Sequence, residues 1–306
     1  MEFLTTRKIS QRRACEILRI SRSLLRYVPK KKDQKLIECL KVMAGKYPRF
    51  GVRRLHAVAR RNGWQVNIKK VRRLCRLQGL LIPKKRHRKR WKGSGRLPCK
   101  AEYVNHVWSY DFVHDSCENG QKIKFLTVIE EYTRYCLCIE VGSRFTSKDV
   151  MAVLERLFAQ YGYPTFIRSD NGPEFIANAL STWLSTKGVT TRYIEPGSPW
   201  QNAVDERFNG TVRDECLNME VFHHVDHARA LVKIFQRHYN QERPHSSLGY
   251  RTPQEIASKH GLEKSKNFSW KTNPLGIGTL GTKIFLPGYG TGITKLLKTI
   301  RSRKSP

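Results

Sequence analysis

The sequence predicts an all-α region followed by an α/β domain. Apolar residues recur at helical spacing as far as Gly79, whereas short apolar runs typical of strands alternate with helical stretches from Val104 onward. The charge divides the chain in the same way: residues 1–100 carry 32 lysines and arginines against 4 acidic residues, and residues 101–260 carry 17 against 20. We therefore expect the basic part to bind a polyanion and the near-neutral part to perform chemistry.

The total charge narrows the class of partner. The chain has 306 residues and a formal net charge of +33, and like charges at this density repel one another unless a polyanion offsets them. No apolar run approaches the roughly 20 residues of a membrane-spanning helix, and the N-terminus has no apolar signal core. We expect a cytoplasmic, nucleoid-associated protein that binds double-stranded DNA and no membrane.

The cysteines indicate neither a zinc site nor a disulfide framework. All eight lie outside any Cys-x-x-Cys pair, so we expect reduced thiols. Cys136 and Cys138 alternate along an expected strand and are predicted to pack on one face of the sheet.

Two short helices are expected first. Ser10 can cap a helix that carries Ala14 and Ile17, and Ser21 can cap a second that carries Leu24. A tight turn between two such helices is typical of a helix-turn-helix, although Arg19 occupies the turn position where that motif favours glycine. A plain helical hairpin remains the alternative.

A second helical pair is clearer. Val52 and Leu55 start an apolar face that ends at Asn62-Gly63, and Asn67 can cap a following helix that ends before Gly79. The opposite faces are basic and suit a phosphate backbone. The candidate DNA contacts on them are Arg53, Arg54, Lys69, Lys70, Arg72 and Arg73.

Composition sets the domain boundaries. Residues 84–95 are strongly basic and then rich in Gly and Ser, so they cannot bury a core face. We expect a helix-turn-helix-like DNA-binding region at 1–83, a basic linker at 84–100, the α/β domain at 101–260 and a basic, glycine-containing extension at 261–306.

The α/β domain is expected to begin with three strands, at 107–113, 124–129 and 135–141, before a helix that opens at Thr146. A strand at 165–168, a helix around 180–185, a strand at 191–194 and a helix from about Trp200 to Leu217 follow. This order is that of an RNase H-like fold.

Two of three candidate catalytic acids lie on the expected strands. Asp111 stands in the middle of an apolar strand, where burying a carboxylate without a cation is costly, although a surface-facing position is an alternative. Asp170 follows the strand 165–168 in an Asp-Asn-Gly turn, which also suits an ordinary helix cap. Its place at the end of a strand favours a functional role.

The third acid, Glu206, lies on the last helix, with Asn209, Gly210 and Arg213 on the same face. A solvated acid paired with Arg213 is the alternative. Three carboxylates on separate elements suit two divalent metal ions held beside a phosphodiester.

The motifs around these acids resemble a known family. They are Trp-Ser-Tyr-Asp-Phe at 108–112, Ser-Asp-Asn-Gly-Pro-Glu-Phe at 169–175, Pro-Trp-Gln-Asn-Ala at 199–203 and Tyr-Asn-x-x-Arg-Pro-His at 239–245. With Arg-Phe-Gly-Val-Arg-Arg-Leu at 49–55, they resemble the downstream-frame transposase of the IS-three family of insertion sequences. These are DDE enzymes of the retroviral-integrase superfamily, and the resemblance covers roughly residues 8 to 260.

The resemblance implies an RNase H-like integrase core and Mg2+-dependent cleavage and joining of DNA at element ends. It assigns Asp111, Asp170 and Glu206 as catalytic ligands of two Mg2+ ions, for which Mn2+ can substitute. Arg213 would be the basic partner on the catalytic helix. The DNA-contacting residues beside the acids would be Asn171, Trp200, Gln201 and Asn202. The implied partners are element ends, target DNA, further copies of the chain, and an upstream-frame protein or frameshift fusion.

The sequence departs from this family at Asp205, where members commonly carry an apolar residue, and from Gly261 onward. Two other functions stay open. A plain RNase H-like nuclease would cut DNA without joining it, and a non-catalytic DNA-binding regulator would need only the basic half.

Overall fold

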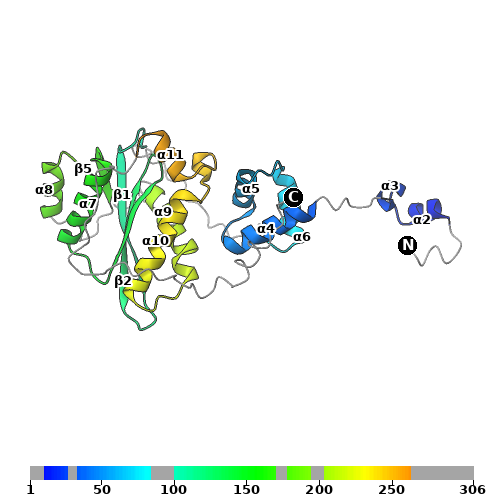
Figure 1. Ribbon diagram of the computed structural model, residues 1–306, viewed down its shortest axis with the longest axis horizontal. Coiled ribbons are helices and arrows are strands. Elements are labelled where there is room, and N and C mark those ends of the chain that lie inside the picture. Colours follow the sequence, from blue (N-terminus) through cyan, green and yellow to red (C-terminus); the bar gives the residue numbers. More distant parts are fainter. Residues whose placement is uncertain (1–9, 27–32, 84–99, 170–177, 194–202, 263–306) are drawn as a thin grey trace, which may run out of the picture. The chain divides into compact units, whose positions relative to one another are not determined.

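A computed structural model describes residues 10–26, 33–83, 100–169, 178–193 and 203–262, which Figure 1 draws as coloured ribbon. The predicted linker at 84–100, except for Lys100, and the extension beyond Leu262 lie outside these residues. No described helix is both long enough and apolar enough to cross a bilayer.

Helices α2 (Gln11–Ile17) and α3 (Arg22–Leu25) begin at the predicted caps. The hydroxyl oxygen of Ser10 accepts from the Arg13 amide at 3.3 Å, and that of Ser21 accepts from the Leu24 amide at 3.2 Å. Arg19, between the helices, has a φ of 52°, the left-handed conformation for which glycine is the usual choice. The tight turn between the two helices therefore forms around an arginine.

Three further helices share one apolar core: α4 (Gln34–Lys46), α5 (Val52–Arg61) and α6 (Ile68–Leu77). Helices α5 and α6 are the predicted pair, and the side chain of Asn67 caps α6 by accepting from the Lys69 amide at 2.8 Å. Helix α4 was not predicted. It contributes the buried residues Leu36, Leu40 and Met43 to the core.

The α/β domain contains five strands in the order β3-β2-β1-β4-β5. Strands β1 (Val107–Ser116), β2 (Lys122–Glu130) and β3 (Cys136–Gly142) form an antiparallel meander, in which β2 pairs with β1 on one side and with β3 on the other. Strands β4 (Phe166–Ser169) and β5 (Thr190–Tyr193) extend the sheet in parallel beside β1. The chain order of strands and helices is the predicted one, and the fold is RNase H-like.

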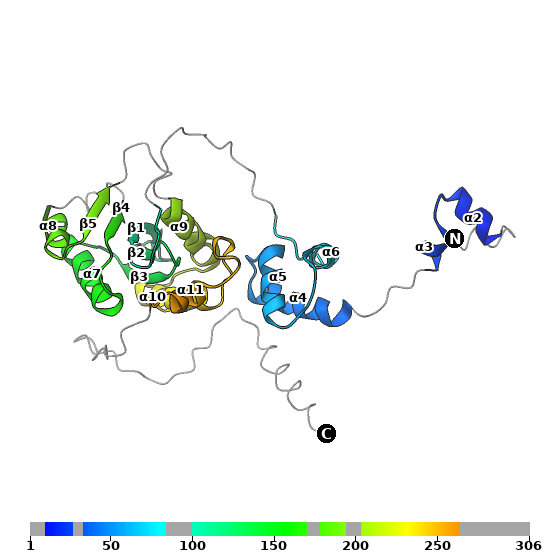
Figure 2. The same cartoon turned by 90° about the horizontal axis from the view of Figure 1, so that it is seen from above.

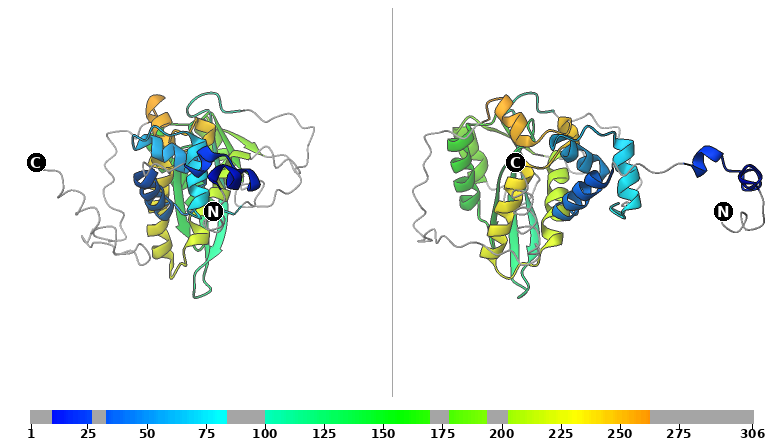
Figure 3. Two further views of the ribbon diagram at one scale, coloured as in Figure 1. Left: turned by 90° about the vertical axis from the view of Figure 1, so that its right-hand side faces the viewer. Right: turned by 45° about the vertical axis from the view of Figure 1, so that its right-hand side comes forward.

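Helices cover both faces of the sheet, as Figures 1 and 2 show. Helices α7 (Ser147–Tyr161) and α8 (Asn178–Thr186) pack on one face around Leu154, Leu157 and Leu184. Helices α9 (Ala203–Glu215) and α10 (Val225–Gln241) pack on the other, around Phe208, Val212 and Phe235. Short 3-10 turns, η3 (Leu217–Met219) and η4 (Ser246–Leu248), and helix α11 (Pro253–Lys259) complete the described domain, which Figure 3 shows from two further sides.

The prediction that Cys136 and Cys138 share a face is wrong. Cys136 packs with the α9 and α10 side chains, whereas Cys138 packs with those of α7 and α8. The register between β2 and β3 shifts at Val128 and Ile129, and this irregularity breaks the strict alternation of side chains. Seven of the cysteines lie among the described residues, and all seven are free thiols.

Candidate active site and nucleic-acid interface

Asp111 lies in the middle of β1, opposite Thr127 of β2. Alternation along the strand places it on the same face as Val113, which packs beneath α9 and α10. Its side chain is half-buried, and its Oδ1 accepts a hydrogen bond from the Phe112 amide at 2.6 Å. The carboxylate therefore sits between the sheet and the helices that cover this face.

Helix α9 is fixed to β1 through Asn209. The Nδ2 of Asn209 donates to Oδ2 of Asp111 at 2.8 Å, and the hydroxyl of Thr127 lies 3.0 Å from the Asn209 Oδ1. The same hydroxyl lies 3.0 Å from the Asp111 carbonyl oxygen. Side chains from three elements thus hold the Asn209 amide in one orientation. Sequence reasoning noted Asn209 only as a neighbour of Glu206.

Glu206 lies three residues before Asn209, about one helical turn along the same face. Its side chain is exposed, and no ion pair joins it to Arg213 among the described residues. Arg213 instead donates to the carbonyl oxygen of His114 at 3.0 Å, while remaining exposed. The helix therefore runs along β1, with Asn209 at Asp111 and Arg213 at His114.

Asp205, one residue before Glu206, is fully buried. Its Oδ2 lies 3.5 Å from the Nδ2 of Asn209, so it faces the interior of the domain. The helical geometry that separates neighbouring side chains by about 100° thus leaves Glu206 as the exposed acid of the pair.

The third acid, Asp170, lies outside the described residues. The last described residue of strand β4 is Ser169. The parallel register pairs Arg168 of β4 with Ser109 of β1, two residues before Asp111. The described end of β4 is therefore adjacent to the strand that carries Asp111.

A buried ion pair joins these two strands. The Nη1 of Arg168 donates to Oε1 of Glu131 at 2.7 Å, and the Ser109 hydroxyl donates to the same oxygen. The Arg168 and Glu131 side chains are 6% and 3% exposed, so water does not solvate the pair. Sequence reasoning did not identify this pair, because nothing local links residues 131 and 168.

The neighbouring Glu130 is also buried and has a structural role. Its carboxylate accepts from the amide and the hydroxyl of Thr133 at 2.6 and 2.5 Å. Burial raises the pKa of Glu130, and these hydrogen bonds oppose that shift. Both acids at the end of β2 are therefore held by protein donors.

The predicted DNA contacts on α5 and α6 differ in whether they pair with an acid of the chain. Arg53, Lys69 and Arg72 are exposed, and no ion pair joins them to another described side chain. Lys70 and Arg73 instead pair with Asp33, at 2.5 and 3.1 Å.

Arg54 is not placed as a DNA contact. Its Nη1 donates to Oε1 of Glu215, at the end of α9, at 2.7 Å, so its guanidinium is turned toward the α/β domain. The spacing of residues along α5 gave no sign of this partner. The remaining predicted DNA contacts, Asn171, Trp200, Gln201 and Asn202, lie outside the described residues.

No group of three His, Cys, Asp or Glu side chains that could hold a metal ion occurs within the described part of the chain. The predicted set of ligands includes Asp170, which is not in that part. Asp111 and Glu206 supply carboxylate oxygens, which are the ligands that hard divalent cations prefer.

Comparison with known families identifies three segments. Residues 31–90 match the HTH-like domain, residues 101–199 match the integrase core domain, and residues 187–253 match a second integrase core domain family.

Relatives cover most of the chain. An uncharacterized 31.7 kDa protein of insertion element IS407 from Burkholderia multivorans is 41% identical over 82% of this chain and 92% of its own length. A 39.2 kDa protein of insertion element IS476 from Xanthomonas euvesicatoria is 39% identical over 85% and 75%. The transposase InsD of an Escherichia coli insertion element is 29% identical over 69% and 74%.

Among solved structures, the HTLV-2 integrase catalytic core domain in complex with magnesium aligns with a TM-score of 0.41 and 17% identity. The alignment covers 50% of this chain and 97% of that one.

Proposed function

This chain belongs to the transposases of the IS-three family of insertion sequences, and we propose that it cuts DNA at element ends and joins the freed 3′-hydroxyl to target DNA through Asp111, Asp170 and Glu206. The observation that carries this proposal is the 2.8 Å hydrogen bond from Asn209 to Asp111. It places the helix of Glu206 directly over the strand of Asp111.

We assign two Mg2+ ions to the three carboxylates. The family uses divalent metal, and the donors fit it: Asp111 and Glu206 offer hard oxygen ligands, which suit Mg2+ better than softer metals. When bound, such ions activate an attacking hydroxyl and stabilise the leaving oxygen of the phosphodiester.

The chain's own residues position these ligands and the DNA. Asn209 and the Phe112 amide orient Asp111 through the two hydrogen bonds to its carboxylate. Arg213, exposed seven residues beyond Glu206 on the same face of α9, would bind a phosphate of the DNA held beside the acids.

The exposed basic residues of α5 and α6 are assigned to the DNA backbone. Arg53, Lys69 and Arg72 lie on the surface of the HTH-like region and would contact phosphates, so binding should weaken as salt rises. Asn171, Trp200, Gln201 and Asn202 remain proposed contacts beside the acids. We propose further copies of the chain and an upstream-frame protein or frameshift fusion as protein partners, at the nucleoid in the cytoplasm.

The test first reads the DNA on either side of the coding sequence for terminal inverted repeats and then uses duplex oligonucleotides that carry those repeats. The wild-type chain should cut them and join their 3′ ends to a target plasmid in Mg2+. Asp111→Asn, Asp170→Asn and Glu206→Gln should each abolish both steps while DNA binding is retained. Strand transfer that survives in one variant would remove that residue from the site.

Two other outcomes separate the alternative functions. A plain nuclease would cut the duplex but leave pre-nicked ends unjoined. A non-catalytic DNA-binding regulator would neither cut nor join the DNA. Its effect in the cell would be the same in the wild type and in all three acid variants.

A further inference from the structure

The carboxylate of Glu215 is buried at the end of α9, nine residues beyond Glu206. Its side chain is 6% exposed and accepts hydrogen bonds from two arginines. Arg243 donates from Nε to Oε2 at 2.7 Å and from Nη2 to Oε1 at 2.8 Å, which is a bidentate pair. Arg54 of α5 donates to Oε1 at 2.7 Å.

Loss of Arg243 and loss of Arg54 should affect the folding of the α/β domain differently. The Arg243 side chain is 6% exposed and belongs to the α/β domain, so its bidentate pair with Glu215 holds α9 within that domain. The Arg54 side chain is 30% exposed and comes from the HTH-like region. Removing Arg54 leaves Glu215 paired with Arg243, whereas removing Glu215 leaves the buried guanidinium of Arg243 without its carboxylate. Arg54 can therefore be tested without unfolding the domain.

The Arg54 contact is one of several in which the HTH-like region supplies the hydrogen-bond donor and the α/β domain supplies the acceptor. Lys46 Nζ and the Tyr47 hydroxyl lie 2.9 and 2.5 Å from Oε2 of Glu242, just after α10. Each of these contacts joins a donor from α4, from Tyr47 directly after it or from α5 to an acid of the α/β domain.

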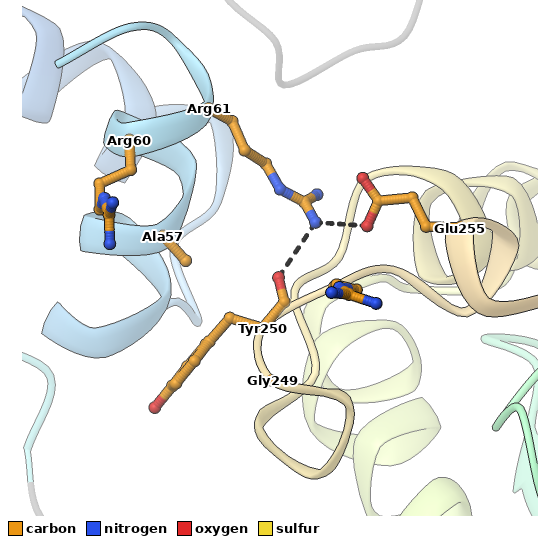
Figure 4. Close-up of a pocket in the computed structure, with 7 residues that line it drawn as sticks. Ala57, Arg60, Arg61, Gly249, Tyr250 and Glu255 are labelled. Atoms are coloured by element: carbon orange, nitrogen blue, oxygen red, sulfur yellow. Dashed lines mark hydrogen bonds and ion pairs between the residues drawn. The ribbon is translucent and has the colours of Figure 1, made fainter. Parts of the chain in front are cut away.

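Arg61 of α5 makes the third contact of this kind. It donates to Glu255 at 2.7 Å and to the carbonyl oxygen of Tyr250 at 3.0 Å. Figure 4 shows these bonds at the edge of an open pocket, where the Arg61 side chain extends from its helix toward Glu255. Exposed ion pairs of this kind each contribute little to stability. The contact at Glu215, whose carboxylate is buried, is therefore the one that should stabilise the link between the two regions most.

We infer that Arg54 is a positioning residue for DNA cleavage: it links the HTH-like region to the catalytic helix α9 through Glu215. The inference rests on the proposed function, because it gives Arg54 a role in placing Glu206. Arg53, next to it on α5, is exposed and assigned to DNA, so one turn of α5 would contact both the DNA and the catalytic helix.

The experiment compares the full-length wild-type chain with Arg54→Ala, Arg54→Lys and the matched variant Arg53→Ala. Hydrogen exchange of the backbone amides in the last turn of α9 reports on the link itself. The kcat for cleavage of terminal-repeat DNA, and the KM for that DNA, report on its consequence. A thermal melt of each variant verifies folding.

In Arg54→Ala, amide exchange in the last turn of α9 should rise, and kcat should fall about tenfold, within the roughly 100-fold that a misplacement of about 1 Å can cost. The KM should change little. In Arg53→Ala, KM should rise while amide exchange in the last turn of α9 stays at the wild-type value. Arg54→Lys should restore part of both, since an ammonium can also donate a hydrogen bond to the Glu215 carboxylate.

Unchanged exchange and kcat in Arg54→Ala would overturn the inference, and so would equal effects of Arg53→Ala and Arg54→Ala, which would make Arg54 a DNA contact. A wild-type chain that neither cuts nor joins would refute the proposed function instead. The exchange measurement would still decide the link: faster exchange in Arg54→Ala supports it, and unchanged exchange overturns it.

Discussion

Asn209 and Asp111 lie 98 positions apart in the chain, and their side chains are joined by a hydrogen bond of 2.8 Å. We predict that Asn209→Ala lowers kcat for cleavage by about 10 to 100-fold, because the acid loses the donor that fixes its orientation and small misplacements are costly. DNA affinity should not change, because Asn209 is half-buried behind Glu206. Single-turnover cleavage and a DNA-binding titration provide the two measurements.

Thr211→Ala on the same helix is the control, since its hydroxyl donates to the carbonyl oxygen of Arg207 within the helix. It should cut DNA at the wild-type rate. Equal losses in the two variants would show that α9 tolerates no change, and the special role of Asn209 would then be refuted.

Divalent metal should bind only when the acids are intact. We predict that EDTA stops cleavage, that Mg2+ or Mn2+ restores it, and that saturating metal raises the melting temperature of the wild-type chain. A ligand at about 100 times its dissociation constant adds about 2.7 kcal/mol to stability. Asp111→Asn should lose this stabilisation. An equal rise in melting temperature in both proteins would place the metal elsewhere.

The salt dependence of DNA binding should distinguish two neighbouring arginines. Each phosphate contact contributes about 0.9 to the slope of log affinity against log salt on duplex DNA. We predict that Arg53→Ala and Arg72→Ala each lower the slope by about one contact, because both side chains are exposed. Arg54→Ala should leave it unchanged, since Arg54 is bound to Glu215. A titration at several salt concentrations measures the slopes, and a lower slope in Arg54→Ala would contradict its assignment.

The buried pair of Glu131 and Arg168 should be costly to break. Glu131→Gln leaves the guanidinium without its carboxylate, and we predict a loss of about 3 to 5 kcal/mol in the free energy of unfolding. Glu155→Gln is the matched control. It removes an ion pair with Lys187 whose side chains are 49% and 30% exposed, so it should cost far less than Glu131→Gln. Urea unfolding compares the two, and similar losses would show that burial of the pair does not matter.

Local chemistry explains which parts of the fold the sequence predicted. Caps such as Ser10 and Asn67 act within three residues, so they mark helix starts without knowledge of the rest of the fold. The chain order of the strands and helices, though not the order of the strands within the sheet, followed from the alternation of apolar runs and turns. Helix α4 was missed because its apolar residues, Leu36 and Leu40 among them, are interspersed with charged ones, and only contact with α5 and α6 identifies its buried face.

The contacts that shape the site could not be predicted in this way. Asp111 stood out because a carboxylate beside apolar residues needs an explanation, and Glu206 because it shares a helix face with Arg213 and follows a motif that resembles the family. Their connection through Asn209, and the connection of Arg54 to Glu215 across 161 positions, depend on how the sheet and helices pack. An arginine-rich helix face predicts phosphate binding equally for each of its members, and only the structure shows that Arg54 is bound to an acid of the same chain.

A buried histidine beside the contact of Arg54 with Glu215 should make the free energy of unfolding depend on pH. His245 is 8% exposed, and burial, together with the charge of Arg243, lowers its pKa to about 2. Its pKa in an unfolded chain is about 6.5. The folded state therefore favours the neutral ring, and this contribution is complete above about pH 6.5 and is lost as pH falls toward the folded pKa. Burial also lowers the pKa of His238, which acts in the same direction.

We predict that the free energy of unfolding falls by about 1.4 kcal/mol per pH unit for His245 alone, or about 2 kcal/mol between pH 6.5 and pH 5. His245→Gln should flatten this dependence, whatever its effect on stability at pH 7. His260→Gln, which removes an exposed histidine, should leave the slope at its wild-type value. Urea unfolding at a series of pH values measures the slopes. An unchanged slope in His245→Gln would mean that water solvates the ring in the folded state. Arg243 and Glu215, which lie beside this ring, would then be more exposed than the structure shows.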